Sequence, residues 1–336
     1  MKLRFRVVLM FIATVGLTSI AHAADPIIIK FSHVVADNTP KGKAALRFKE
    51  EAERRTAGKV KIEIYPNSTL YGDNDEVDAL IAGKVQMIAP SPLKLGPRDF
   101  PEFEVFNLPY IFPSKSVLRR VTDGKIGQDL LKKPERKNIL GLAYWDNGFY
   151  VMSANKPLRS VADFKGMKMR IPPSDVFEAQ MRVLGAIPVK MAFAEAYQAL
   201  KTGSVNGTQN PPSNLYTQKM HEVQKYITVS NHAYLGYMVC TNKTFWESLP
   251  SDIRVQLKLA MIDATRYANL YAEEDNNEAL AKIVAGGKNE IYELTLDERE
   301  TWRRALMPIH RDMEARIGRE LIQSIYDESS ALGHKR

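Results

Sequence analysis

The amino-acid sequence predicts an α/β protein of two lobes, with one long helix crossing both lobes. Strand-like and helix-like segments alternate along residues 27–91 and again along residues 167–210. About 313 of the 336 residues remain once an N-terminal leader is set aside, which is enough for two lobes rather than one. A helical pattern free of proline and glycine then fills residues 251–285.

The first alternating unit begins with an apolar, β-branched strand at residues 27–31. A helix follows in "TPKGKAALRFKEEAERRTAGK", where Gly58 stops it, and "VKIEIYPN" alternates as the next strand. A second helix lies in "DNDEVDALIAG" and "VQMIAPS" is another strand. Because strands alternate with helices, the sheet is expected to be largely parallel.

The second unit repeats this order after residue 160. Strands are predicted in "GMKMRI", "IPVK" and "SVNGTQN", and helices in "SDVFEAQMRVLGA" and "AFAEAYQALKTG". In the first of these strands Met167, Met169 and Ile171 alternate with charged residues before two prolines end the pattern. Arg170 is therefore expected at the carboxyl end of a short strand, just ahead of a helix.

The long helix has Ser251 as its expected N-cap and Gly286 and Gly287 as its stop. At about 1.5 Å per residue it would measure roughly 50 Å, longer than one small lobe is wide. The alternative is a pair of helices broken near Glu274 and Asp275.

The N-terminus has the pattern of a secretory signal. Lys2, Arg4 and Arg6 precede an apolar run that ends at Ala21-His22-Ala23. A single membrane anchor is the alternative, but the run is shorter than the ~20 apolar residues that a span requires. We expect residues 1–23 to be a signal peptide, residues 24–147 and 233–272 to form lobe I, and residues 148–232 and 273–336 to form lobe II, in an exported protein.

Composition and motifs exclude several classes of function. The formal charge of +8 includes the three basic leader residues, and the remaining excess is dispersed among acids, so nucleic acid is not an expected partner. Cys240 is the only cysteine, which rules out an intramolecular disulfide. Nucleophile-elbow, dinucleotide and phosphate-loop motifs are absent from the sequence, and the six histidines have no i, i+4 pair. The spacing gives a metal site no support, so we expect no metal and no cofactor. An enzyme, such as a secreted hydrolase or lyase, remains an alternative, but the motifs indicate no nucleophile with a base beside it.

Polar residues stand at the predicted carboxyl ends of strands, where open α/β sheets bind ligands. Arg170 is the most specific of them, because a guanidinium matches a carboxylate with two parallel hydrogen bonds. The alternative is a structural ion pair with Asp163 or Asp175. The other strand-end residues are His33, Ser91 and Asn210. Aromatic residues that could wall a cleft, or else fill the core, are Trp145, Phe149, Tyr150 and Phe193.

Ordered blocks along the mature chain resemble the solute-binding proteins of tripartite ATP-independent periplasmic (TRAP) transporters, most closely the branch that binds four-carbon dicarboxylates. These blocks include "IKFSHVVADNTPKGKAALRFKEEAERRTAGKVKIEIYPNSTLYGD", "FNLPYIF", "YWDNG", "SANKPLR", "GMKMR", "MAFAEAYQALKTGSVNGTQNPPSN" and "QKMHEVQKYITVSNHAYLGYMV". The resemblance implies a two-lobed periplasmic protein that closes on an organic acid such as malate, succinate or fumarate. It further implies delivery of that acid to a membrane permease, by a protein that catalyses nothing and is expected to be a monomer.

The resemblance also implies roles for single residues. Arg170 would grip a substrate carboxylate with support from Asn210, and Phe193 would wall the site. His232 would belong to a polar network at the hinge rather than touch the ligand. The remaining expected ligand-binding residues are Ser91 and His33 from the other lobe, with Tyr150, Trp145 and Asn214.

Two departures from the dicarboxylate branch leave the substrate open. Tyr150 stands where that branch usually has a basic residue, and Gln209 replaces its usual acid. A second carboxylate buried without a cation is unfavourable, so a diacid would need another cation, such as Lys41 or Lys94. The alternatives are a monocarboxylate with a hydroxyl, keto or aromatic remainder, or the same fold presenting its ligand to a membrane sensor.

Overall fold

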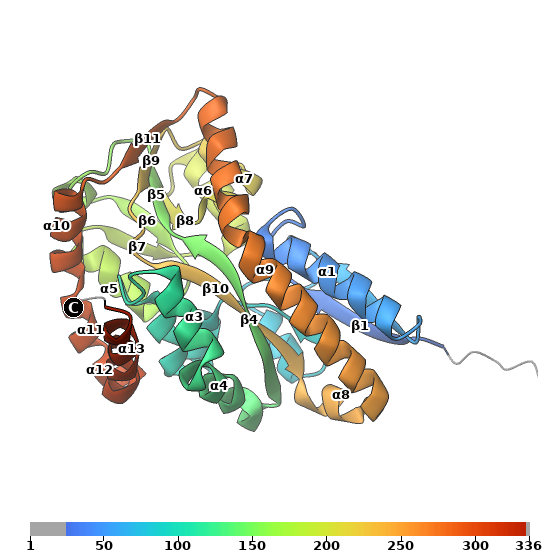
Figure 1. Cartoon of the computed structure of the whole chain (residues 1–336). Helices are drawn as coiled ribbons and strands as arrows, with labels where there is room; N and C mark the ends of the chain where they lie inside the picture. Colours follow the sequence, from blue (N-terminus) through green and yellow to red (C-terminus); the bar gives the residue numbers. More distant parts are fainter. Residues whose placement is uncertain (1–24, 334–336) are drawn as a thin grey trace, which may run out of the picture.

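The computed structural model describes residues 25–333, which form two mixed β-sheets with helices packed around them (Figure 1). The first sheet has the strand order β2-β1-β3-β10-β4. Its β1 pairs in parallel with β2 and β3, whereas β10 runs antiparallel to β3 and β4. Its strands are β1 (Ile27–Ser32), β2 (Val60–Tyr65), β3 (Met87–Ile88), β4 (Ile139–Phe149) and β10 (Tyr234–Asn242).

The second sheet has the order β11-β9-β5-β8-β6-β7. In it β6 lies between β7 and β8 and is parallel to both, while β5 is antiparallel to β8 and β9. Its strands are β5 (Val151–Ala154), β6 (Lys168–Ile171), β7 (Ile187–Lys190), β8 (Gly207–Asn210), β9 (Tyr226–Val229) and β11 (Glu290–Glu293).

Helices cover both sheets. We call the first sheet with α1–α4, α8 and η1–η3 the first half, and the second sheet with α5–α7 and η4–η6 the second half. The α-helices are α1 (Pro40–Arg55), α2 (Glu76–Ile81), α3 (Lys115–Asp123), α4 (Lys125–Lys132), α5 (Asp175–Val183), α6 (Ala196–Thr202), α7 (Pro212–Thr217), α8 (Lys243–Ser248), α9 (Ser251–Ala285), α10 (Leu296–Leu306), α11 (Pro308–Asp312), α12 (Glu314–Ile317) and α13 (Arg319–Ala331). The 3-10 helices are η1 (Pro92–Arg98), η2 (Pro101–Asn107), η3 (Lys133–Lys137), η4 (Val161–Phe164), η5 (Phe193–Glu195) and η6 (Met220–Glu222).

The chain passes between the halves at three places. Tyr150 alone separates β4 from β5, and a short segment joins β9 to β10. The third passage is α9, which packs against α1 and β4 of the first half and α7 of the second half (Figure 1). The C-terminal helices also contact both halves, because α11 packs on α5 while α13 packs on α3.

The predicted long helix is confirmed as one continuous helix of 35 residues. Small alanine side chains on its buried side allow it to lie close to its neighbours, whereas exposed apolar side chains such as Leu270 are scattered along its outer side.

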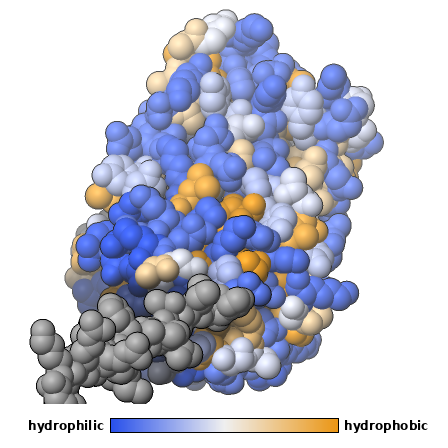
Figure 2. Space-filling model, turned by 90° about the vertical axis from the view of Figure 1, so that its right-hand side faces the viewer, coloured by the Kyte–Doolittle hydropathy of each residue, from blue (hydrophilic) through white to orange (hydrophobic). Residues whose placement is uncertain are grey.

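The face of the molecule in Figure 2 is mostly hydrophilic, with hydrophobic residues scattered across its middle. Isolated apolar side chains of this kind are normal for a protein surface.

Helix α1 begins where the sequence predicts, because Thr39 accepts a hydrogen bond from the amide of Gly42 and Pro40 occupies the first turn. Gly42 is required there: a Cβ at this position would lie 2.3 Å from the carbonyl oxygen of Ala36. The neighbouring Lys41, in the same first turn, is completely buried.

The predicted strands and helices of both units are present, and the α/β fold is confirmed. The strand predicted in "VQMIAPS" is only two residues long. The leader predicted at residues 1–23 lies outside the described residues, and the lobe boundaries stay a prediction. Within residues 25–333, none of the helices combines the length and the apolar character that crossing a bilayer would need.

Candidate functional site

A small cavity lies between the two halves, at the kind of interface where small-molecule sites are commonly found. The first half contributes loops that follow β1, β2 and β3, and the second half contributes the ends of β6 and β8. The cavity is lined by Val34, Val35, Lys41, Asp73, Ser91, Leu93, Lys94, Tyr150, Arg170, Pro172, Phe193, Asn210, Asn214, Leu235 and Tyr237. Six of the predicted ligand-binding residues are thereby brought together: Arg170, Asn210, Tyr150, Phe193, Ser91 and Asn214.

Arg170 enters the cavity from β6, where the following prolines end the strand. Its side chain is buried, and its Nε and Nη2 both donate to the carbonyl oxygen of Met191, at 3.1 and 2.7 Å. The ring of Phe193 lies 5.8 Å from the guanidinium carbon. Within residues 25–333 Arg170 forms no ion pair, so neither Asp163 nor Asp175 is its partner. Burial lowers its pKa, and the nearby Asp73 opposes this shift.

Two asparagines stand beside Arg170 on the second half. Asn210 ends β8 and uses its amide nitrogen in long contacts of 3.4 Å to the Thr208 hydroxyl and 3.5 Å to a methionine sulfur. Asn214 accepts a hydrogen bond from Asn147 at 3.0 Å and donates to the hydroxyl of Tyr237 at 3.4 Å. The Asn214 side chain is thus held by two residues of the first half, whereas the side-chain oxygen of Asn210 makes no hydrogen bond among the described residues.

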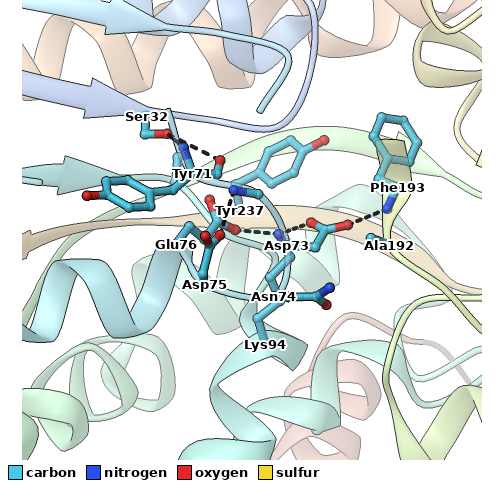
Figure 3. A network of polar contacts seen from close by, with 12 residues as sticks. Ser32, Tyr71, Asp73, Asn74, Asp75, Glu76, Lys94, Ala192, Phe193 and Tyr237 are labelled. Atoms are coloured by element: carbon cyan, nitrogen blue, oxygen red, sulfur yellow. Dashed lines mark hydrogen bonds and ion pairs between the residues drawn. The ribbon is translucent and has the colours of Figure 1, made fainter. Parts of the chain in front are cut away.

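Lys94 lies in the first-half wall and is neutralised by protein carboxylates (Figure 3). Its Nζ contacts both Asp73 and Glu76, and all three side chains are buried. Although burial alone would lower the pKa of Lys94, the two carboxylates raise it above its ordinary value. Lys94 in turn helps to hold the pKa of Asp73 at about 2. Lys94 therefore already has two protein carboxylates as counter-ions and does not need a ligand for this purpose.

Lys41 lies in the same wall and has no such partner. Its Nζ donates to the carbonyl oxygen of Ala89 at 2.9 Å and lies 3.9 Å from the ring centre of Tyr237. Among the described residues it forms no ion pair. Burial lowers the pKa of Lys41 to about 7, because desolvation penalises the ammonium more than nearby Glu76 and Asp73 favour it.

Tyr150 lies at the crossing between the sheets and lines the cavity. Its ring packs edge-on against Phe177 at 5.4 Å, and its amide donates to the carbonyl of Ala233 at 2.9 Å. Burial raises the pKa of its hydroxyl above the ordinary value, so the group stays neutral. Tyr150 therefore offers a neutral hydrogen-bonding group where a basic side chain would offer a charge.

Two predicted site residues do not line the cavity. His33 lies on the same face of the chain as Phe31, two residues earlier, and its ring packs edge-on against that of Phe31 inside the core. Burial lowers the pKa of His33 to about 3. Trp145 lies in the middle of β4, and its indole nitrogen donates to the hydroxyl of Thr265 on α9 at 3.0 Å. Both side chains are fully buried behind the cavity wall.

His232 forms a separate polar network next to the β9–β10 crossing, outside the cavity lining. Its Nδ1 is 2.7 Å from the hydroxyl of Ser230 and its Nε2 is 2.6 Å from Oε1 of Gln209. Burial lowers the pKa of His232 to about 3, so the ring is neutral. A neutral ring donates from Nε2 to Gln209 and accepts at Nδ1 from Ser230. Because this Ser–His pair is buried, it offers no accessible nucleophile.

Sequence reasoning missed Asp73 and Tyr237 as cavity residues and named Lys41 and Lys94 only as alternative cations. One signal could have singled out Lys41: it lies in the first turn of α1, where the helix dipole disfavours a cation. Asp73 gave no comparable signal, because it lies in a polar turn before α2. Within the described residues the cavity thus holds two cations without a carboxylate partner, Arg170 and Lys41. This arrangement suits an anionic ligand with two charged groups.

Comparison with known proteins identifies a family that covers most of the chain. The family DctP, described as bacterial extracellular solute-binding protein, family 7, matches residues 31–316. The chain is 54% identical over 319 residues to the C4-dicarboxylate-binding periplasmic protein DctP of Rhodobacter capsulatus, which covers 93% of this chain and 96% of that protein.

Two solved structures with the same fold contain a bound organic acid. A TRAP periplasmic solute-binding protein from Shewanella oneidensis with bound succinate matches with a TM-score of 0.88 and 41% identity, over 90% of this chain and 99% of that one. A second, from Pseudomonas aeruginosa with bound L-malate, matches with a TM-score of 0.83 and 44% identity, over 85% of this chain and 100% of that one.

Proposed function

The chain belongs to family 7 of the bacterial extracellular solute-binding proteins, and from this premise we propose that it captures a four-carbon dicarboxylate for a TRAP transporter. The relatives support this substrate class, since one is named for C4-dicarboxylates and two similar structures hold succinate and L-malate. The family is one of binding proteins, in agreement with the expectation that the protein is not an enzyme.

The observation that carries the proposal is the pair of cations without protein counter-ions. Arg170 comes from the second half and Lys41 from the first half, and both line one cavity. A buried cation without an anion is unfavourable, and a dianionic ligand would neutralise both at once. Lys94 is not available for this role, because Asp73 and Glu76 already neutralise it.

We assign the two carboxylates of the ligand accordingly. One would be held by Arg170 through Nη1 and Nη2, with the side chain of Asn210 beside it, because Nη1 makes no hydrogen bond among the described residues. The other would be held by Lys41. Lys41 would therefore supply the positive charge that the dicarboxylate branch usually has at the position of Tyr150. Ser91, Phe193 and Asn214 would complete the walls.

A monocarboxylate with a hydroxyl or keto group is the second candidate. It is favoured by Tyr150, which places a neutral hydroxyl at the cavity, and by the lowered pKa of Lys41, which leaves part of that group uncharged near neutral pH. In this case Arg170 would still hold the single carboxylate, while Lys41 and Tyr150 would contact the polar remainder.

The cellular setting follows from the same family. Relatives are named periplasmic, and the leader at residues 1–23 has the composition of an export signal. We propose that the mature protein binds its ligand in the periplasm and delivers it to the membrane permease. Presentation of the same ligand to a membrane sensor is distinguished by which membrane protein the loaded form binds.

A thermal-shift panel of mono- and dicarboxylates tests the substrate class. A ligand that binds with micromolar affinity adds about 4 kcal/mol of apparent stability at millimolar concentration, so stabilisation by succinate and malate is expected to exceed that by monocarboxylates. A larger shift with a hydroxy or keto monoacid would favour the second candidate.

Arg170→Ala tests the carboxylate anchor. Removing one partner of a buried charged pair costs about 2–5 kcal/mol, which is roughly 30-fold to several thousand-fold in succinate affinity by calorimetry. Arg182→Ala is the matched control, because Arg182 is an exposed arginine of the same half paired with Glu178 on α5. Equal affinity of the Arg170 and Arg182 variants would contradict the assignment.

A further inference from the structure

The turn between β2 and α2 is fixed firmly to the first half (Figure 3). The amide of Tyr71 donates to the hydroxyl of Ser32 on β1 at 3.3 Å, and the same hydroxyl lies 3.4 Å from the Tyr71 carbonyl oxygen. The amide of Gly72 donates to Asp75 at 2.7 Å, which closes the turn. These hydrogen bonds hold the turn in place, and the Asp73 side chain points from it toward the second half.

Asp73 bridges the two halves with its two carboxylate oxygens. Oδ1 contacts Nζ of Lys94 in the first half, and Oδ2 accepts a hydrogen bond of 2.5 Å from the backbone amide of Phe193 in the second half (Figure 3). The Asp73 side chain is only 6% exposed, so this bond is shielded from water. A hydrogen bond to an ionised acceptor is stronger than one between neutral groups.

The residues that receive this bond also hold Arg170. The carbonyl oxygen of Met191 accepts both hydrogen bonds from the guanidinium, and the ring of Phe193 packs near it at 5.8 Å. The amide of Ala192 donates to Glu195 at 3.1 Å, whereas the next amide, that of Phe193, donates to Asp73 in the other half. Residues 191–193 therefore connect Asp73 of one half with Arg170 of the other.

We propose that Asp73 is a positioning residue, a latch that ties the first half to residues 191–193 and so holds Arg170 in place over a closed cavity. The proposal rests on the proposed function only in taking Arg170 as the ligand anchor. Opening of the cleft must break the bond between Asp73 and the Phe193 amide. Loss of the latch is expected to favour the open form and to speed ligand release.

The latch differs from a purely electrostatic role, because the two predict opposite effects on affinity. Asp73 is a negative charge close to Arg170, so its removal would tighten the binding of an anion if only its field mattered. If Asp73 is a latch, its removal weakens ligand binding, although the cavity becomes more positively charged. Asp73→Ala leaves Lys94 paired with Glu76, so the fold is expected to persist.

Another hydrogen bond also joins the two halves and provides a comparison. Nε2 of Gln218, after α7, is 3.4 Å from Oδ1 of Asn67, after β2, and this bond lies at the surface, with Asn67 exposed and Gln218 half-buried. A long, neutral and exposed hydrogen bond contributes little, so Gln218→Ala is expected to leave closure unchanged. Asn74→Ala is a second control within the same turn, because Asn74 is exposed.

The experiment measures the distance between the halves in the full mature chain without ligand. Spin labels are placed on cysteines introduced at Leu46 of α1 and Val183 of α5, both 43% exposed, while the native Cys240 is fully buried and will not be labelled. Asp73→Ala is expected to shift the distance distribution toward longer values and to speed succinate dissociation about tenfold. Asp73→Asn keeps an acceptor oxygen and is expected to fall between this variant and the wild type.

An unchanged distance distribution in Asp73→Ala, or tighter succinate binding by it, would overturn the latch. A shift of equal size in Asn74→Ala would overturn it as well. If the unsubstituted protein failed to bind any dicarboxylate, the proposed function would fail instead, and the ligand-free distances would still test the latch.

Discussion

Two buried lysines in the same wall of the cavity have opposite surroundings. Lys94 contacts two carboxylates, which raise its pKa, whereas Lys41 contacts a carbonyl oxygen and an aromatic ring, and its pKa falls to about 7. Both side chains are at most 9% exposed, so burial does not distinguish them. The two lysines differ in their counter-ions. Lys94 has protein carboxylates and therefore a structural role, whereas Lys41 has none and can pair with an anionic ligand.

The largest expected effect is a loss of stability when Lys94, the lysine with protein counter-ions, is replaced. Lys94→Met leaves Asp73 and Glu76 buried without their cation, and breaking a buried ion pair in this way destabilises by about 3–5 kcal/mol. Chemical denaturation of the ligand-free protein measures the free energy of unfolding. The matched control is Lys41→Met, the same substitution in the same wall, which is expected to leave that stability unchanged or to raise it.

Lys41→Met is expected not to lower the stability, because the pKa of Lys41 is lowered in the folded protein. A lysine whose folded pKa lies at about 7, below its unfolded value of 10.5, reduces stability increasingly as pH falls from 10.5 to 7 and fully below pH 7. Methionine removes this penalty. A large stability loss in Lys41→Met, equal to that in Lys94→Met, would show that the two lysines do not differ in role.

The pH dependence of binding is the next largest effect. A dianion at Lys41 favours the ammonium, so above pH 7 binding must take up a proton that the ligand-free protein has lost. Succinate affinity is therefore expected to fall by up to about tenfold per pH unit above pH 7. Calorimetry in two buffers with different heats of ionisation measures the uptake. Affinity independent of pH between 7 and 9, without proton uptake, would count against a role for Lys41.

The smallest effect concerns the ring beneath Lys41. Tyr237→Leu removes a cation–π contact worth about 0.5–2 kcal/mol, so succinate affinity is expected to fall about 2- to 30-fold. Tyr237→Phe keeps the ring and removes only the hydroxyl that Asn147 and Asn214 contact. If calorimetry gave the two variants the same reduced affinity, the hydroxyl rather than the ring would support Lys41, and wild-type affinity in both would show that neither does.

Local patterns predicted much of the fold and part of the site. Period-two alternation followed by prolines was enough to place Arg170 at the end of β6, and an interval without proline or glycine was enough for α9. The same periodicity accounts for His33, since residues 31 and 33 share a face and His33 therefore turns into the core with Phe31. The position of His33 after a strand was therefore not enough to predict whether its side chain faces the cavity or the core.

Contacts between distant segments could not be predicted in this way. Strands β4 and β10 pair in an antiparallel ladder with two irregularities, although about 90 residues separate their partners, and neither segment alternates cleanly. Asp73 meets the Phe193 amide across 120 residues. Its neighbours in sequence indicate only a turn before a helix. The monomeric state expected from the sequence also stays a prediction.

The most direct test of the account compares succinate with succinamate, in which a neutral amide replaces one carboxylate, on the wild-type protein and on Lys41→Met. The wild type is expected to bind succinate about 30-fold or more tightly than succinamate, since the second carboxylate pairs with a buried cation. Lys41→Met is expected to lose most of this preference. A variant that binds both ligands more weakly by the same factor, and so keeps the preference, would contradict the assignment of Lys41 to the second carboxylate.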